Sequence, residues 1–250
     1  MLAAILRDAA RQYRRRPAPV TATVLVLFVL QLGVWLAGDA GQPAGGRQDA
    51  GRAVLAMVVA LAAFALGVLV ELFLVAFLAA NLAAEPTPVG DALTAARRWF
   101  RPGIRAGLLE LAYVVIASLA GALLLGPRSG PVSDAELTIL WIGTTPLVGL
   151  ALAFLAVLRQ RIVLGGQRRV WAAAAASHRV AGAYFPVCLL IGLSQAVGIG
   201  AGNVTLGLAQ RLAACLLVAT AAPFLVAMSN ALDLRTRALH AVAPKRGDVP

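Results

Sequence analysis

Long runs of apolar residues, rather than a short-period alternation, dominate the hydrophobic pattern of this chain. A run of about 20 apolar residues matches the hydrocarbon core of a bilayer, where each segment must satisfy its own backbone hydrogen bonds. The pattern therefore predicts an all-α, polytopic transmembrane bundle of six helices. The runs cover residues 18–37, 53–83, 104–125, 137–158, 183–201 and 204–232.

Three shorter segments, residues 2–16, 88–101 and 167–182, have apolar stripes at helical spacing and arginines elsewhere on the wheel. Such helices can lie in the headgroup layer, with arginine reaching anionic lipids, although a solvated linker helix would give the same spacing. We expect eight arginines here to contact lipid headgroups. They are Arg14, Arg15, Arg16, Arg97, Arg98, Arg101, Arg168 and Arg169.

The amphipathic segments recur at nearly equal intervals along the chain. Each ends in aromatic residues and a proline directly before an apolar run, at Pro17, Pro102 and Pro186, which are 85 and then 84 residues apart. A near-constant period predicts duplicated units, here an interfacial helix followed by a helical hairpin. We interpret the chain as one membrane domain followed by a flexible cytoplasmic tail. The repeats span about 1–84, 85–166 and 167–235, and the tail spans 236–250.

This threefold pattern resembles bacterial six-helix membrane proteins related to the membrane domain fused to some glycerophosphodiester phosphodiesterases. The Arg-rich segments before the three prolines carry the resemblance, which covers residues 1–235. The phosphodiesterase activity belongs to a separate soluble domain, which this sequence does not contain. The resemblance therefore implies a fold and assigns no catalytic residue.

A second resemblance is to the permease subunits of type-2 ABC exporters, which also have six helices and a basic N-terminal interfacial helix. Residues Arg7 through Pro19 fit that start. The long basic segment from Arg159 to Val180 and the short turn at Gly198–Gly202 fit less well. This resemblance implies a separate ATPase as partner, because the sequence has no Gly-rich GK[ST] loop.

The distribution of basic residues predicts how the bundle is oriented. Eighteen of the 22 Arg and Lys residues lie in the N-terminus, the second and fourth loops and the C-terminus, against three in the loops between them. Basic residues accumulate on the cytoplasmic side of membrane proteins. We therefore expect a multi-pass protein of the bacterial cytoplasmic (inner) membrane with both termini in the cytoplasm.

Composition narrows the possible functions further. Hydrophobic residues make up 60% of the chain and charged residues 13%, about half the usual share for a soluble domain. The net charge of +11 is explained by the arginines of the cytoplasmic loops, so we expect no nucleic-acid partner. With no metal-binding motif, catalytic constellation or cofactor fingerprint, we expect a non-catalytic protein without a cofactor.

Four polar residues inside the apolar runs are the candidate intramembrane site: Glu71, Glu110, Gln195 and Arg211. At about 1.5 Å per residue, both carboxylates fall in the cytoplasmic half and Arg211 in the outer half. Pairing of either Glu with Arg159 or Arg161 is therefore easier than with Arg211. Such residues can form a proton, cation or substrate site, or they can hold helices together.

The sequence thus favours a transport or lipid-handling component, with Arg211 as the polar contact within the bundle and anionic lipid headgroups as partners. An exporter permease working with a separate ATPase is the alternative. A membrane scaffold that recruits an enzyme is a third possibility.

Overall fold

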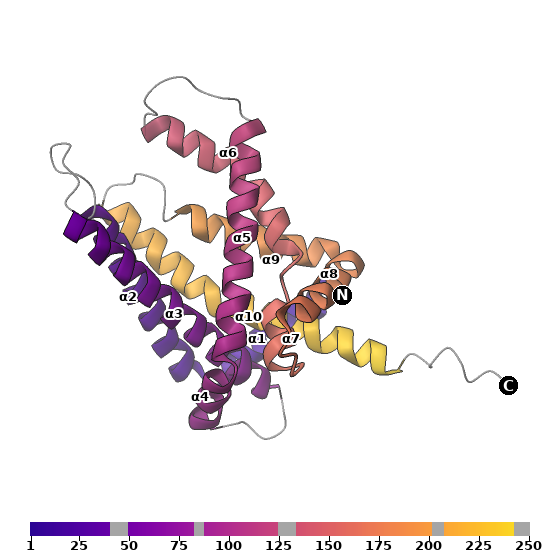
Figure 1. The fold of residues 1–250 in the computed structure, drawn as a ribbon. Coiled ribbons are helices and arrows are strands. Elements are labelled where there is room, and N and C mark those ends of the chain that lie inside the picture. Colours follow the sequence, from indigo (N-terminus) through magenta and orange to yellow (C-terminus); the bar gives the residue numbers. More distant parts are fainter. Residues whose placement is uncertain (41–49, 83–87, 125–133, 202–207, 243–250) are drawn as a thin grey trace.

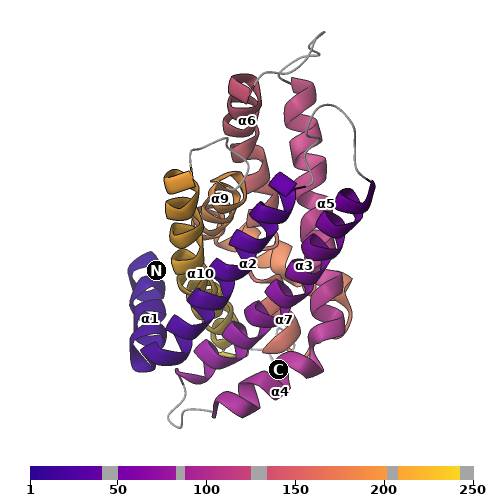
Figure 2. The same cartoon turned by 90° about the vertical axis from the view of Figure 1, so that its left-hand side faces the viewer.

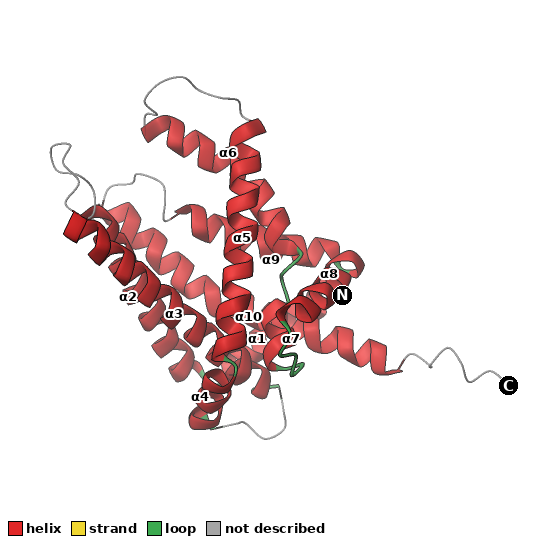
Figure 3. Cartoon of the chain, viewed as in Figure 1, coloured by secondary structure: helices red, strands yellow, loops and turns green. Residues whose placement is uncertain are grey.

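The computed structural model describes residues 1–40, 50–82, 88–124, 134–201 and 208–242. Throughout these ranges the regular structure is helical and no strand occurs (Figure 1, Figure 3), so the predicted all-α class is confirmed. The helices are α1 (Leu2–Arg15), α2 (Pro17–Ala40), α3 (Ala50–Ala80), α4 (Val89–Arg98), α5 (Phe100–Leu124), α6 (Asp134–Ala153), α7 (Leu158–Val163), α8 (Val170–Ala183), α9 (Phe185–Ala201) and α10 (Leu208–Val242).

Within the described ranges, five helical segments are long and apolar enough to cross a bilayer. A sixth crossing requires α8 and α9 to count as one span, although they meet at 116°. The 17 residues of α9 reach only about 25 Å, less than the ~30 Å hydrocarbon core. The five segments are Pro17–Leu36, Ala53–Ala80, Phe100–Leu124, Ile142–Val163 and Gln210–Leu239. These helices are compatible with an integral membrane protein that crosses the bilayer several times.

Each of α1, α4 and α8 is separated from the next helix by a single residue outside regular helical geometry. A proline follows within the first turn of the next helix, where its missing amide hydrogen costs nothing. The chain therefore changes direction at these points instead of continuing as one long helix. The separating residues are Arg16, Trp99 and Tyr184.

Fully buried side chains gather at one end of the bundle. Leu72, Val75 and Phe77 of α3 and Leu232 of α10 are among the completely buried core residues. In contrast, the first half of α3 leaves large apolar side chains more than half exposed, Leu61 among them. Apolar exposure of this kind is what lipid contact requires, because acyl chains are as apolar as the side chains. Figure 2 shows the long helices side by side, with α1 and α4 at the lower end where the core lies.

Helix α1 packs on α10 and on the end of α3 (Figure 2). The side-chain amide of Gln12 is fully buried and donates a hydrogen bond to the Ala227 carbonyl at 3.0 Å, while the Asn81 amide donates to the Gln12 carbonyl at 3.0 Å. An ion pair between Asp8 and Arg235, at 2.5 Å, adds a third link. The apolar stripe predicted for an interfacial helix is therefore largely occupied by protein.

The backbones of helices α6 and α9 approach each other closely at Gly192. A Cβ atom there would collide with the Gly149 carbonyl oxygen and lie 2.6 Å from the Ala153 amide nitrogen. Only a residue without a side chain lets the two backbones meet at this distance. This contact anchors α9 beside α6 even though α9 is short.

Candidate functional site

The short helix α7 continues from α6 within the bundle, and both contribute to the single span-length segment Ile142–Val163. Residues 154–157 connect α6 to α7 through turns with hydrogen bonds between residues three apart. Leu158 and Ile162 are then completely buried, which fixes α7 between its neighbours. As a result, Arg159 and Arg161 lie inside the protein.

Two glycines end α7 and make room for the residues around it. Gly166 has a φ of 64°, a left-handed conformation that glycine adopts without strain. A Cβ at Gly165 would collide with the Arg161 carbonyl oxygen and lie 2.8 Å from the Arg237 guanidinium. The Gly-Gly pair therefore allows α10 to bring Arg237 close to the end of α7.

The structure brings Arg159 together with both predicted carboxylates. Its guanidinium donates hydrogen bonds to the two Glu110 oxygens at 3.2 and 2.5 Å and forms an ion pair with Glu71. The side chains of Arg159, Glu110 and Glu71 are 10%, 21% and 32% exposed. The sequence left Arg159 and Arg161 open as partners of these glutamates; both glutamates pair with Arg159, which links α3, α5 and α7.

A small cavity adjoins this ion cluster. It is lined by Glu71, Glu110 and Arg159 together with Gln195 of α9 and Ser229 of α10, and its volume of about 20 Å³ holds about one water molecule. Gln195 thus lines the same cavity as the ion cluster. The cavity has the polar lining needed for a bound water or proton, but no room for a larger substrate.

A second ion cluster surrounds Asp233, whose side chain is 0% exposed. Its two oxygens pair with Arg161 at 2.6 Å and with Arg237, one turn further along α10, at 2.6 Å. Arg161 also donates to the Thr236 hydroxyl at 3.1 Å. The first cluster contains one arginine and two carboxylates, whereas this one contains two arginines and one carboxylate. The net charges of the two clusters, which α7 joins, therefore cancel.

These clusters change the interpretation of two of the 18 basic residues. The sequence predicted that Arg159 and Arg161 belong to a cytoplasmic loop, but both lie within the span-length segment Ile142–Val163 and are ion-paired inside the bundle. Likewise, α10 continues to Val242, beyond residue 235, the predicted end of the membrane domain. The contacts of Asp233 and Arg237 with α7 account for this extension.

Arg211 lies apart from the glutamates, on a groove between α2, α3, α9 and α10. Its guanidinium carbon is 4.8 Å from the centroid of the Trp35 ring, a cation–π contact. The groove has a volume of about 560 Å³ and is otherwise lined mainly by aliphatic and small side chains, with Gln31 as a further polar group. The structure therefore separates the four predicted polar residues into two places: Glu71, Glu110 and Gln195 line the small cavity, and Arg211 lines the groove.

Most of the eight arginines expected at lipid headgroups are exposed. Arg97 and Arg98 end α4, and Arg98 also contacts the Trp99 ring at 5.7 Å. Arg15 differs, because it donates a 2.6 Å hydrogen bond to the Asn81 carbonyl and thereby ties α1 to the end of α3. Exposure makes lipid contact possible for the others of this set: Arg14, Arg101, Arg168 and Arg169 are exposed and Arg16 is half-buried.

Sequence reasoning missed Asp233 and Trp35. The spacing of Asp233 and Arg237, four residues apart on a helix, was a signal for an ion pair. Trp35 offered no comparable signal, because its contact with Arg211 depends on how α2 and α10 are rotated against each other. Among the described residues, no group of three His, Cys, Asp or Glu side chains could hold a metal ion.

Comparisons of the chain with protein-family models, curated proteins and solved structures give no match.

Proposed function

We propose that this chain is a non-catalytic membrane protein that binds an anionic amphiphile, such as a phospholipid, in the groove at Arg211 and acts in lipid handling or transport. The observation that carries the proposal is the combination of a long apolar groove with one guanidinium. An acyl chain fits the aliphatic walls, and an anionic group fits the cation.

The chemistry of the Arg211–Trp35 pair supports an anionic ligand. Stacking uses the face of the guanidinium, whereas its N–H donors lie in the plane and suit the paired oxygens of a phosphate or carboxylate. Cations inside a bilayer are costly, and they commonly mark a ligand or ion path. Val34 and Ile199 line the groove and are more than a third exposed, so an acyl chain could enter from the lipid.

The two ion clusters at α7 have a structural part in this proposal. They link α3, α5, α7 and α10, three of which are span-length helices. Their charges are balanced, so a substrate does not need to neutralise them. We assign ligand binding to the groove. We assign to the two clusters the role of holding the helices together at the opposite end of the bundle.

The proposal includes a topology with six crossings, three repeats, and both ends in the cytoplasm of a bacterial inner membrane. The order of elements supports the repeat, since α1, α4 and α8 are each joined by one residue to a long or bent membrane helix. Labelling of single cysteines introduced near residues 14, 97 and 168 tests the orientation. All three should react with an impermeant maleimide only after the cell membrane is opened.

The binding proposal is tested with the variants Arg211→Gln and Ala214→Trp. Purified protein is analysed by native mass spectrometry for retained lipids. Loss of the cation should reduce anionic lipid about fivefold, because one such contact contributes about 1 kcal/mol. Filling the groove at Ala214, which lines it, should reduce lipid of either charge. Arg11→Gln, the same charge change on the exposed face of α1, is the matched control.

Unchanged lipid retention in both groove variants would refute the proposal. Co-purification of an ATPase in near-equal amount would replace it with the exporter permease, and release of a bound enzyme by changes in the basic helices would favour the scaffold. Each of these outcomes points to a different partner, so one purification separates the three functions.

A further inference from the structure

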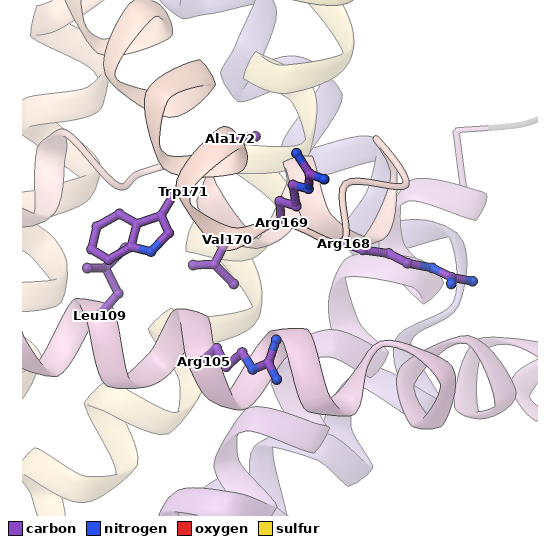
Figure 4. A pocket seen from close by; sticks show the side chains of 7 residues that line it. All are labelled: Arg105, Leu109, Arg168, Arg169, Val170, Trp171 and Ala172. Atoms are coloured by element: carbon purple, nitrogen blue, oxygen red, sulfur yellow. The ribbon is translucent and has the colours of Figure 1, made fainter.

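A second pocket lies where α5 meets the beginning of α8. None of its lining residues lines the Arg211 groove. Its volume is about 600 Å³ (Figure 4). Its lining includes Arg105, Leu109, Arg168, Arg169, Val170 and Trp171.

The pocket has a cationic end and an apolar end. In Figure 4 the side chains of Arg105, Arg168 and Arg169 extend in different directions, and Trp171 and Leu109 lie together on the other side. No acidic residue is among those that line it. Three exposed guanidinium groups without a carboxylate beside them make this region positively charged, so the arrangement favours an anionic group such as a phosphate.

These three arginines differ from the arginines of the bundle interior. Within the described part of the chain, Arg159, Arg161, Arg235 and Arg237 all pair with carboxylates. Among the same residues, no ion pair involves Arg105, Arg168 or Arg169, and all three are exposed. Their charge is therefore available to an external ligand.

The position of the pocket identifies the source of the phosphate as a membrane lipid. Arg105 is five residues from the start of the span-length helix α5, roughly 7.5 Å along its axis, which is the depth of a headgroup region. Leu109 lies one helical turn deeper. The Trp171 side chain is 75% exposed, and tryptophan with an exposed ring is typical of the membrane–water interface.

We propose that this pocket binds the phosphate of an anionic phospholipid, with the arginines on the headgroup and with Leu109 and Trp171 against the upper acyl chains. The site is separate from the Arg211 groove and does not depend on it. The site combines two exposed arginines of the segment before α8, Arg168 and Arg169, with Arg105 of α5.

The experiment titrates the purified full chain with phosphatidylglycerol or phosphatidylcholine and counts bound lipids by native mass spectrometry. The wild type should prefer phosphatidylglycerol. The triple variant R105Q/R168Q/R169Q should lose that preference by on the order of 100-fold, since each basic side chain contributes about fivefold. The matched triple R7Q/R11Q/R179Q removes the same charge from exposed arginines outside the eight expected headgroup contacts and should keep it. The same triple change made in an Arg211→Gln background should cause the same further loss, which separates this site from the proposed groove.

Equal losses in the two triple variants would overturn the proposal, because general charge would then explain binding. Competition by millimolar glycerol 3-phosphate, without a lipid requirement, would overturn the lipid as occupant and indicate a free phosphate. If the glutamine variant fails to fold, R105K/R168K/R169K takes its place. Its retained charge should preserve a preference that weakens from about 0.05 to about 0.5 M salt, whereas a salt-independent preference would contradict the ionic contacts.

Discussion

Replacing Arg159 with glutamine tests whether charge compensation holds the interior of the bundle together. The change leaves Glu71 and Glu110 facing each other and the small cavity without their shared cation. Removing one partner of a buried ion pair costs about 3–5 kcal/mol. Glu71 is 32% exposed, so water can reduce the penalty. We therefore expect Arg159→Gln to lower the free energy of unfolding by about 3 kcal/mol.

The assay uses the natural cysteines. Cys188 is completely buried, so a thiol-reactive dye reports its exposure on unfolding in a Cys215→Ser background. A loss of about 3 kcal/mol corresponds to a fall in melting temperature on the order of 10 °C. Arg101→Gln, the same charge change at an exposed position of α5, should stay within about 0.5 kcal/mol of the parent.

The triple variant E71Q/E110Q/R159Q decides between charge and packing. It keeps the shapes of both glutamates, shortens the arginine just as the single variant does, and removes all three charges, so most of the lost stability should return. If Arg159→Gln melts with the parent protein, or if the triple variant is no more stable than the single one, the cluster does not act through charge compensation.

Three further changes use the same unfolding assay. Gly192→Ala should lose about 1–3 kcal/mol because its Cβ would meet the backbone of α6, whereas Gly182→Ala, with open space around its Cβ, should be neutral; equal effects would refute the close-approach argument. Asp233→Asn leaves two arginines facing each other and should lose about 3 kcal/mol of stability. An unchanged melting temperature would mean that water already screens the two arginines. Gln12→Leu removes a buried hydrogen bond to α10 and should lose about 1–3 kcal/mol, and an unchanged melting temperature would mean that α1 contributes little.

The sequence was sufficient for the helical class and for several apolar helices long enough to span a membrane, and it favoured Arg159 or Arg161 as partners of Glu71 and Glu110. Those predictions depend on run length and on depth along a helix, which are local quantities. It was not sufficient to choose Arg159 over Arg161, or to predict the Asp233 cluster and the Trp35–Arg211 contact. These depend on how whole helices rotate against each other, and such features follow from packing between distant segments.

The close approach at Gly192 shows the same limit. Many glycines in this chain would fit a contact between helices, and the choice of Gly192 against α6 follows from the register of two helices that are far apart in sequence. Likewise, the sequence predicted an apolar stripe on residues 167–182, but Trp171 is exposed and the buried face of α8 consists mainly of small residues such as Ala173 and Ala174. A stripe of alanines gives a weak signal because alanine is abundant throughout the chain.

The two clusters on α7 also bear on how the protein is made. Both acidic partners of Arg159 are synthesised before it, so that arginine can be neutralised as soon as α7 emerges. Arg161 has to wait for Asp233, which follows only after α8 and α9. Until α10 is synthesised, Arg161 therefore lacks the carboxylate that pairs with it in the finished fold. The α7 segment thus acquires its two ion clusters at separate stages of synthesis, the second only when α10 is in place.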